Sequence, residues 1–586
     1  MQDAVALNPA EQPPSNRLRN RFRAAFTQEN VATMAVALVI AVAVILPLIA
    51  LVISSFLVLD DQGWDTTWGF DNYVTLFTDR VIPKAFLNTL LISSGSTVVA
   101  TVLGVALAWI NARTNCPGRD YLEPYNLIPF FLSPFVGAIA WHNLAAPQTG
   151  LLNIWARDYL GIEGHLLNVD TLWGVVWVTG IFFTPLVYLF VVGSLRRMDP
   201  SLEDSARTTG AGLFRTTMTV TLPLVMPGIL SGAIIVFVTS AGEFGVPFKL
   251  SAPYGWETLT TQIFSKAVGD DANHYLGATM SMALGVITVF LIWIQQRYIA
   301  PRSFTTVTGK GFRPNVLDLG GWKWVAFGFN ISYIMIAVVL PILCLIIVSL
   351  HPVWTAKIEF SQMSFINYEK TLFFWQPNSI KAATNGIFNS FILAFIGASL
   401  AMVLAIVISY MIHRTKNFGA RLLDFLSVVP IGFPGIVLAM GVLVTYIQTP
   451  IYATLWILLL GYVTRFFPYG QRNVSSIMLA ISEELDQSSR MAGASWFTTL
   501  RRITIPLLKP GIFAGWVLMF IIFMRELSIS IILYTTGTET LSVGVYYLSN
   551  FENEPLTAAL SMAQTVVLLA CVYLFRKVAG KEALTA

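Results

Sequence analysis

The segment from Leu202 to Gly228 reads LEDSARTTGAGLFRTTMTVTLPLVMPG, and a second copy from Leu485 to Gly511 reads LDQSSRMAGASWFTTLRRITIPLLKPG. Matching residues include Leu202, Arg207, Gly210, Ala211, Phe214, Pro223, Pro227 and Gly228 in the first copy, and Leu485, Arg490, Gly493, Ala494, Phe497, Pro506, Pro510 and Gly511 in the second. Chance similarity between apolar stretches does not keep charged, glycine and proline positions in register. The chain is therefore predicted to contain an internal repeat.

Further matches extend this repeat on the N-terminal side of both copies. Asn88, Arg113, Thr114 and Pro129 return at one constant offset as Asn389, Arg414, Thr415 and Pro430. Thr171-Leu172-Trp173 returns as Thr454-Leu455-Trp456 at a smaller offset, the same one that aligns Gly210 with Gly493. The decrease indicates a longer loop between the third and fourth apolar segments of the first half. The duplication thus covers most of the chain.

Composition assigns the chain to the membrane. Only 12% of its 586 residues are charged, too few to cover a soluble protein of this size. The run from Val31 to Leu57 carries no charge and exceeds the roughly 20 residues that cross a bilayer. Cys116, Cys344 and Cys571 are too widely separated to suggest a disulfide framework or a metal site.

We predict an all-α polytopic membrane protein with about 12 transmembrane helices, arranged as two parallel six-helix repeats related by a pseudo-two-fold axis along the membrane normal. A cytoplasmic tail would occupy residues 1–30, the first half 31–310 and the second half 311–586. The predicted spans are 31–57, 86–110, 121–145, 172–195, 226–248, 275–297, 324–350, 388–412, 422–447, 454–479, 510–534 and 557–576. Basic residues cluster after the even-numbered spans, so both termini are expected to face the cytoplasm.

The duplicated segment resembles the EAA loop of binding-protein-dependent ABC importer permeases, whose pattern is E-A-A-x3-G-x9-I-x-L-P. The positions that fit are Asp204, Ser205, Ala206, Gly210, Val220, Leu222 and Pro223 in the first copy, and Gln487, Ser488, Ser489, Gly493, Ile503, Ile505 and Pro506 in the second. The E-A-A triplet itself is altered in both copies, whereas the glycine, its spacing and the proline are intact. In such permeases this loop couples the pore to an ATPase.

Partners follow from this resemblance. The chain has no G-x-x-x-x-G-K-[ST] segment, so ATP and Mg would be bound by separate subunits and no cofactor is expected in this chain. Two loops imply two ABC ATPase subunits on the cytoplasmic side. A periplasmic or lipid-anchored solute-binding protein would deliver cargo at the opposite face of the bacterial inner membrane, the chain would lie in the lipid bilayer, and no nucleic acid is expected as a partner.

The physical properties of the segment suit a mechanical coupler. Glycine at 210 and 493 permits a sharp turn between two short helices. Small residues in the altered triplets would let a partner surface approach closely. Pro223 and Pro227 would break the second short helix and begin the fifth span, since proline is tolerated in a first helical turn.

Two carboxylates are candidates for the translocation path. Glu243 and Glu526 stand at equivalent places within the fifth span of each half, in the register that aligns Gly210 with Gly493. An ionisable residue inside a span suggests a functional site, here an outer vestibule or gate for a cationic or metal-bearing solute. Structural pairing, for example of Glu526 with its neighbour Arg525, is the alternative. No metal site is predicted.

The cargo is suggested only by resemblance. The fused two-half layout and the segments Phe70–Asp79, Glu243–Pro247 and Arg525–Val543 look most like the permeases for ferric iron. Thiamine or an organophosphonate is the alternative cargo. An ion-coupled secondary transporter, with Glu243 and Glu526 as proton carriers, is the alternative class, although the duplicated loop would have no role in it.

Overall fold

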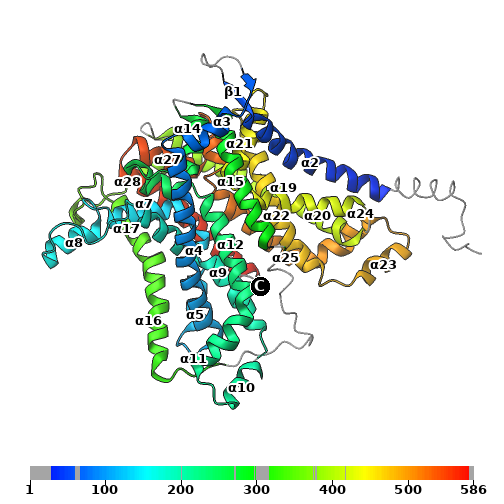
Figure 1. Ribbon diagram of the computed structural model, residues 1–586, viewed down its shortest axis with the longest axis horizontal. Coiled ribbons are helices and arrows are strands. Elements are labelled where there is room, and N and C mark those ends of the chain that lie inside the picture. The colour runs from blue at the N-terminus through cyan, green and yellow to red at the C-terminus, as the bar shows by residue number, and fades with distance from the viewer. Residues whose placement is uncertain are drawn as a thin grey trace, which may run out of the picture. The chain divides into compact units, whose positions relative to one another are not determined.

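The computed structural model describes residues 28–59, 66–199, 201–269, 272–295, 297, 316–373, 375–376, 379–415 and 418–579 (Figure 1). Residues 1–27, nearly all of the predicted tail, lie outside this range. Two compact units are distinguished. One contains Met1–Leu46, Ser399–Ile431 and Val463–Trp516, and the other contains Pro47–Ala398, Gly432–Tyr462 and Val517–Ala586.

Helices make up most of the described chain. The longer ones are α2 (Gln28–Ser55), α4 (Ile82–Arg113), α9 (Leu172–Arg197), α12 (Leu222–Ala241), α15 (His274–Ile294), α16 (Lys323–Ile334), α19 (Lys381–Arg414), α20 (Phe418–Gly432), α22 (Leu455–Met478), α25 (Ile505–Met524) and α28 (Glu554–Ala579). The shorter α-helices are α3 (Asp71–Thr78), α5 (Arg119–Asn126), α6 (Ile128–Phe131), α7 (Pro134–Ala145), α8 (Leu151–Leu160), α10 (Ser201–Thr208), α11 (Leu213–Thr216), α13 (Gly245–Leu250), α14 (Leu259–Val268), α17 (Leu340–Ser349), α18 (Ile366–Leu372), α21 (Gly435–Tyr446), α23 (Glu483–Met491), α24 (Trp496–Thr499), α26 (Ser530–Leu533) and α27 (Leu541–Phe551).

Nine helical segments in the described chain are long and apolar enough to cross a membrane, and two bent pairs raise the number to eleven. They are Asn30–Ser55, Ile82–Arg113, Leu172–Arg197, Phe214–Ala241, His274–Ile294, Gly320–Ser349, Lys381–Arg414, Trp496–Met524 and Glu554–Leu574. The predicted span 454–479 corresponds to α22, which does not qualify. Arg465, Gln471 and Arg472 interrupt its apolar sequence.

The third predicted span of each half is broken rather than straight. In the first half the chain bends by 98° between Arg119–Phe131 and Pro134–Ala145. Ser133 has extended backbone angles, as expected for a residue before proline, and so separates the two helices. In the second half the pair is Phe418–Gly432 and Gly435–Tyr446, with extended ψ at Pro434.

Helices α4, α9 and α12 pack side by side (Figure 1). Small residues allow this close approach: a β-carbon added at Gly104 of α4 would come within 2.8 Å of Val187 on α9, and one at Gly232 of α12 would come within 3.0 Å of the same residue. Ser96 Oγ also donates to the Val176 carbonyl across the α4–α9 contact at 3.2 Å. Such contacts are the usual means of helix association in lipid.

The repeated Thr171 is a helix cap. Its side chain accepts a hydrogen bond from the Gly174 N–H at the start of α9. Replacing Thr171 with alanine is expected to lower the free energy of unfolding by about 1 kcal/mol, since one N–H of the first turn loses its acceptor. The thermal unfolding midpoint of the purified protein measures this. Thr171→Ser keeps the acceptor and should behave as wild type, and an unchanged midpoint in the alanine variant would contradict the role.

The end of the repeat that contains Asn88 and Asn389 is also preserved in hydrogen bonds. Asn88 donates to the Glu257 carbonyl at 2.8 Å, and Asn389 donates to the Glu539 carbonyl at 2.9 Å. The threonine that follows each glutamate then caps a helix, α14 or α27. The repeated asparagines therefore anchor equivalent turns.

One small sheet accompanies the helices of this all-helical membrane fold. Strands β1 (Leu57–Leu59) and β2 (Thr66–Trp68) pair antiparallel, with Val58 opposite Thr67. Apolar length alone does not predict it, because each strand has three residues and depends on its partner.

Candidate functional site

The first duplicated loop, Leu202–Gly228, turns sharply at Gly210. Helix α10 ends before this residue, whose φ is +88°. The Gly210 N–H donates to the Arg207 carbonyl at 3.0 Å, and the Ala211 N–H donates to the Ala206 carbonyl at 3.1 Å. These two bonds form a Schellman motif, which satisfies the last carbonyls of a helix. The turn predicted at this glycine is present.

The second duplicated loop, Leu485–Gly511, has the same turn. Gly493 follows α23 with a φ of +87°. Its N–H donates to the Arg490 carbonyl at 2.9 Å, and the Ala494 N–H donates to the Ser489 carbonyl at 3.1 Å. Within the described residues, no atom lies within 4 Å of the place where a β-carbon would stand at either Gly210 or Gly493. Both glycines are therefore required by backbone conformation and not by crowding.

The predicted coupling residues lie mostly on the surface of these loops. Asp204, Ser205, Gln487 and Ser488 are exposed, whereas Ala206 and Ser489 are half-buried. Large apolar side chains are exposed beside them: Phe214 is 76% exposed and Phe497 is 56% exposed. Pro223 is the second residue of α12, as predicted, and Pro506 is the second residue of α25. Pro227 was expected to help begin the span but lies inside α12, because Pro223 already occupies the first turn.

Each loop joins its long helix through a π-helical segment. These segments are Thr217–Thr221 before α12 and Leu500–Thr504 before α25. Short π-helical segments are rare and often accompany functional sites. Their occurrence at the same place in both halves was not predicted from sequence.

A buried carboxylate in the first loop also escaped the sequence analysis. Glu203, 3% exposed, forms an ion pair with Arg113, the last residue of α4. Its other oxygen, Oε1, accepts a hydrogen bond from Thr221 Oγ1 at 2.6 Å. The end of α4, the short helix α10 and the start of α12 are thus joined through one side chain.

The second loop repeats this triad. Asp486 Oδ2 lies 2.8 Å from Arg414 Nε, and Asp486 Oδ1 accepts from Thr504 Oγ1 at 3.2 Å. Arg414 also donates to the Ile481 carbonyl at 2.8 Å. The available signal was the register of the repeat, in which Glu203 aligns with Asp486. A search for identical residues passes over that conservative pair.

Glu243 and Glu526 lie where their helices break. Helix α12 ends at Ala241 and α25 ends at Met524, so neither carboxylate is inside a regular helix. Glu243 Oε1 accepts from the Gly245 N–H at 3.1 Å, and Glu526 Oε1 accepts from the Ile529 N–H at 2.9 Å. Each side chain therefore supports the start of the next short helix, α13 or α26. These hydrogen bonds give the two glutamates a structural role, which is the alternative to a role in the translocation path.

The breaks themselves meet in one cluster. The Arg525 guanidinium donates at 2.5 Å to the carbonyl of Phe130, near the end of α6, and at 2.8 Å to that of Leu132, between α6 and α7. Gly242 packs against Pro434, where an added β-carbon would come within 2.5 Å. We call this set the break cluster: residues 130–134, 242–245, 433–435 and 525–529. It brings together the two predicted glutamates, and both Glu526 and Arg525 act electrostatically on Glu243.

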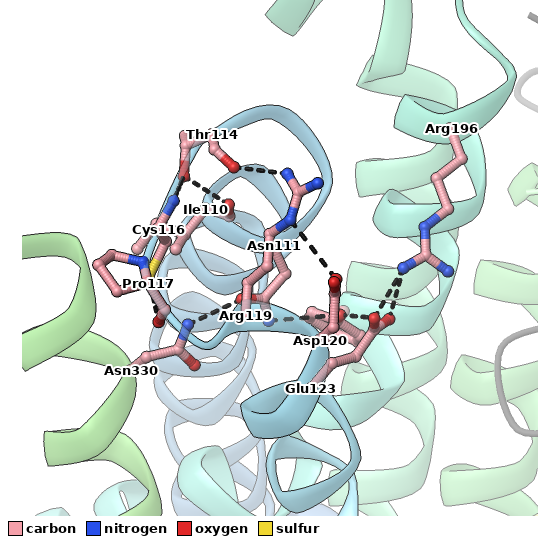
Figure 2. A network of polar contacts seen from close by, with 11 residues as sticks. Ile110, Asn111, Thr114, Cys116, Pro117, Arg119, Asp120, Glu123, Arg196 and Asn330 are labelled. Atoms are coloured by element: carbon pink, nitrogen blue, oxygen red, sulfur yellow. Dashed lines mark hydrogen bonds and ion pairs between the residues drawn. The ribbon is translucent and has the colours of Figure 1, made fainter. Parts of the chain in front are cut away.

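A second polar cluster ties α4, α5, α9 and α16 together (Figure 2). Arg196 of α9 binds both oxygens of Glu123 on α5 at 2.8 Å. Asn330 of α16 donates to Asn111 of α4 at 2.8 Å and accepts from Asn126 of α5 at 2.6 Å. Buried amide pairs of this kind fix helix packing in an apolar setting. Within the described residues no group of three or more His, Cys, Asp or Glu side chains is placed to hold a metal ion.

Comparison with known proteins adds to this geometry. A family model described as "Binding-protein-dependent transport system inner membrane component" matches residues 100–305 and 401–580, and the two starting positions are equivalent in the register that aligns Asn88 with Asn389. The "Ferric transport system permease protein FbpB" of Actinobacillus pleuropneumoniae is 24% identical over 565 residues, 94% of this chain and 78% of that protein. The "Putative ferric transport system permease protein FbpB 1" of Haemophilus influenzae is 25% identical over 80% of this chain and 73% of its own length.

A shorter relative matches only part of the chain. The "Molybdenum transport system permease protein ModB" of Escherichia coli K12 is 28% identical over 214 residues, which cover 36% of this chain and 90% of that protein. Nearly the whole of this relative thus corresponds to about a third of the present chain.

Proposed function

We propose, from the premise that this chain belongs to the family of binding-protein-dependent transport system inner membrane components, that it carries ferric iron across the membrane in two fused halves. The chain is a non-catalytic permease component of an ABC importer and a multi-pass inner membrane protein. This family membership excludes the ion-coupled secondary transporter. The predicted relation of two parallel six-helix halves by an axis along the membrane normal belongs to the proposal.

The observation that carries the coupling part of the proposal is the duplicated glycine turn. Each turn presents an exposed short helix with exposed apolar neighbours, Leu202 and Phe214 in one loop and Leu485 and Phe497 in the other. Exposed apolar side chains grouped around a rigid turn suit a docking surface. We assign Asp204, Ser205, Ala206, Gly210 and Pro223, with Gln487, Ser488, Ser489, Gly493 and Pro506, to contact with two ATPase subunits in the cytoplasm, which hold the ATP and Mg.

This assignment fixes the remaining partners. If both loops face the cytoplasm, a solute-binding protein, periplasmic or lipid-anchored, docks on the other side of the membrane. Both chain termini then lie in the cytoplasm, in accord with the basic residues that flank the same ends of the spans.

Ferric iron as cargo is supported by two of the named relatives and by the chemistry of the break cluster. The two ferric permeases are similar to this chain over 94% and 80% of its length. Carboxylates such as Glu243 and Glu526 are hard oxygen ligands, which suit a hard cation. We place them beside the path and not in a resident metal site.

Uptake of labelled ferric iron tests the cargo. Cells that express the chain with its ATPase and binding protein are expected to accumulate iron only when ATP is available. The double variant Glu243→Gln/Glu526→Gln should reduce uptake by about tenfold or more, because the path loses its negative charge. Gln preserves the acceptor oxygen for Gly245 and Ile529, so helix starts are retained.

Two results would contradict these statements separately. Unchanged uptake in the double variant removes the glutamates from the path while leaving iron as cargo. Uptake of thiamine or an organophosphonate, with no uptake of iron by the wild type, replaces the cargo and leaves the importer assignment intact.

A further inference from the structure

We propose that Glu203 and Asp486 are positioning residues that make each coupling helix move as one body with its own long helix. This inference rests on the proposed docking of ATPases at the duplicated loops. It concerns the buried side of those loops and assigns a role to two triads, Arg113–Glu203–Thr221 and Arg414–Asp486–Thr504.

In the first triad the carboxylate uses both oxygens on two different helices. One oxygen pairs with Arg113 at the end of α4, and the other accepts from Thr221, the last residue of the π-helical segment before α12. All three residues are buried, with exposed fractions of 0% for Arg113, 3% for Glu203 and 2% for Thr221. Nε and Nη1 of Arg113 have no acceptor among the described residues, so Glu203 supplies its counter-charge there.

The second triad reaches the same arrangement with different atoms. Asp486 is one methylene shorter than Glu203, and it meets Nε of Arg414 instead of the Nη2 used by Arg113. The spacing from carboxylate to threonine is 18 residues in both loops. The two loops thus keep the same contacts, carboxylate to arginine and carboxylate to threonine, although one uses glutamate and the other aspartate. Similarity of sequence alone does not account for this, because the shorter side chain has to reach different atoms of the arginine.

The energetic consequence is that α10 is held rigidly against the end of α4 and the start of α12. A buried charge that loses its partner is strongly unfavourable, so α10 cannot tilt away from α4 and α12 without breaking two charge-assisted contacts. The exposed face of α10 remains available to a partner, while its buried face is held. Displacement of α10 is therefore passed to α12 and not absorbed by the turn at Gly210.

Helix α12 then carries the displacement to the break cluster. It has 20 residues and is about 30 Å long. One end is held at Thr221 by Glu203, and the other ends at Ala241, two residues before Glu243. A push on the coupling helix thus arrives at the segment that contains the candidate path residue.

Thr221 and Thr504 offer the least disruptive test. Valine has nearly the shape of threonine, so Thr221→Val/Thr504→Val removes only the link from each carboxylate to the long helix and leaves both ion pairs in place. The complete complex of chain, ATPases and binding protein is reconstituted in liposomes. ATP hydrolysis is measured with and without the iron-loaded binding protein, alongside iron uptake and the amount of ATPase that co-purifies.

We expect stimulation of ATP hydrolysis by the binding protein to fall about fivefold in the double variant, within the range by which residues along a coupling route change it. Basal hydrolysis and co-purified ATPase should stay at wild-type levels. The matched control is Thr239→Val, on the exposed side of α12, whose hydroxyl bonds to the Ile235 carbonyl of its own helix. This control should keep full stimulation.

Three outcomes bear on specific statements. Full stimulation in the double variant refutes the transmission role. Loss of complex in proportion to loss of activity, with unchanged stimulation per complex, makes the triads structural only. A variant altered at Gly210 and Gly493 tests the docking itself, independently of the triads. Loss of co-purified ATPase in this variant supports docking at the loops. Full retention of ATPase with full stimulation refutes it.

Discussion

Replacement of Gly210 and Gly493 together by valine is expected to reduce transport strongly while leaving the chain in the membrane. The two glycines have φ values of +88° and +87°, a region that a β-branched residue does not adopt without strain. The strain is about 1–2 kcal/mol at each position, and it is relieved by unwinding the turn that presents the coupling helix. Uptake per amount of chain in the membrane should fall by about tenfold or more, since about 1.4 kcal/mol changes an equilibrium tenfold.

Asparagine at the same two positions is the matched control. Asparagine tolerates positive φ better than other non-glycine residues, and the space around both positions is open. Gly210→Asn/Gly493→Asn should therefore retain a substantial part of the uptake. Equal loss in the asparagine and valine variants would mean that a partner needs the bare glycine surface, and equal retention would remove the turn from the coupling argument.

Arg525→Met should be the most destabilising single change in the break cluster. It removes the donor of two carbonyls, those of Phe130 and Leu132, at a half-buried position. An unsatisfied buried acceptor costs about 1–3 kcal/mol, so we expect a loss of about 2–4 kcal/mol in unfolding free energy. The thermal unfolding midpoint of the purified chain in detergent measures this loss.

Arg421→Met provides the comparison, because Arg421 is exposed on α20. Its effect should stay within about 0.5 kcal/mol, as for ordinary surface substitutions. Arg525→Lys keeps the charge but not the planar fork that reaches two carbonyls, and it should fall between the other variants. If Arg525→Met unfolds at the wild-type midpoint, the guanidinium does not hold the α6–α7 break.

The repeat made much of the candidate site predictable. Residues aligned by a fixed offset proved to have the same backbone role, as for Asn88 and Asn389 or Gly210 and Gly493. The common register of Glu243 and Glu526 likewise anticipated their place in one cluster. The offset between the two halves of the repeat identifies equivalent positions, and it does so without any information about how the chain folds between them.

The path itself was not predictable in the third span of each half. Mean hydropathy over a window of residues carries no information about the direction of the chain. Residues 121–145 therefore appear as one apolar segment, although the chain bends by 98° at Ser133-Pro134. The burial of Arg113 was not predicted either. Arg113 lies beyond the end of the predicted span 86–110, whereas Glu203, 90 residues away, makes complete burial of the guanidinium tolerable.

The arginine of the break cluster has a consequence for how such permeases can be built. In the repeat, Arg525 aligns with Gly242, so the cluster holds one guanidinium and one glycine at equivalent positions. An assembly of two identical chains would have two arginines there, with mutual repulsion, or none, with the carbonyls of Phe130 and Leu132 left without a donor. Joining the halves in one polypeptide allows a single positive charge at this site, so covalent fusion makes a lasting chemical asymmetry possible.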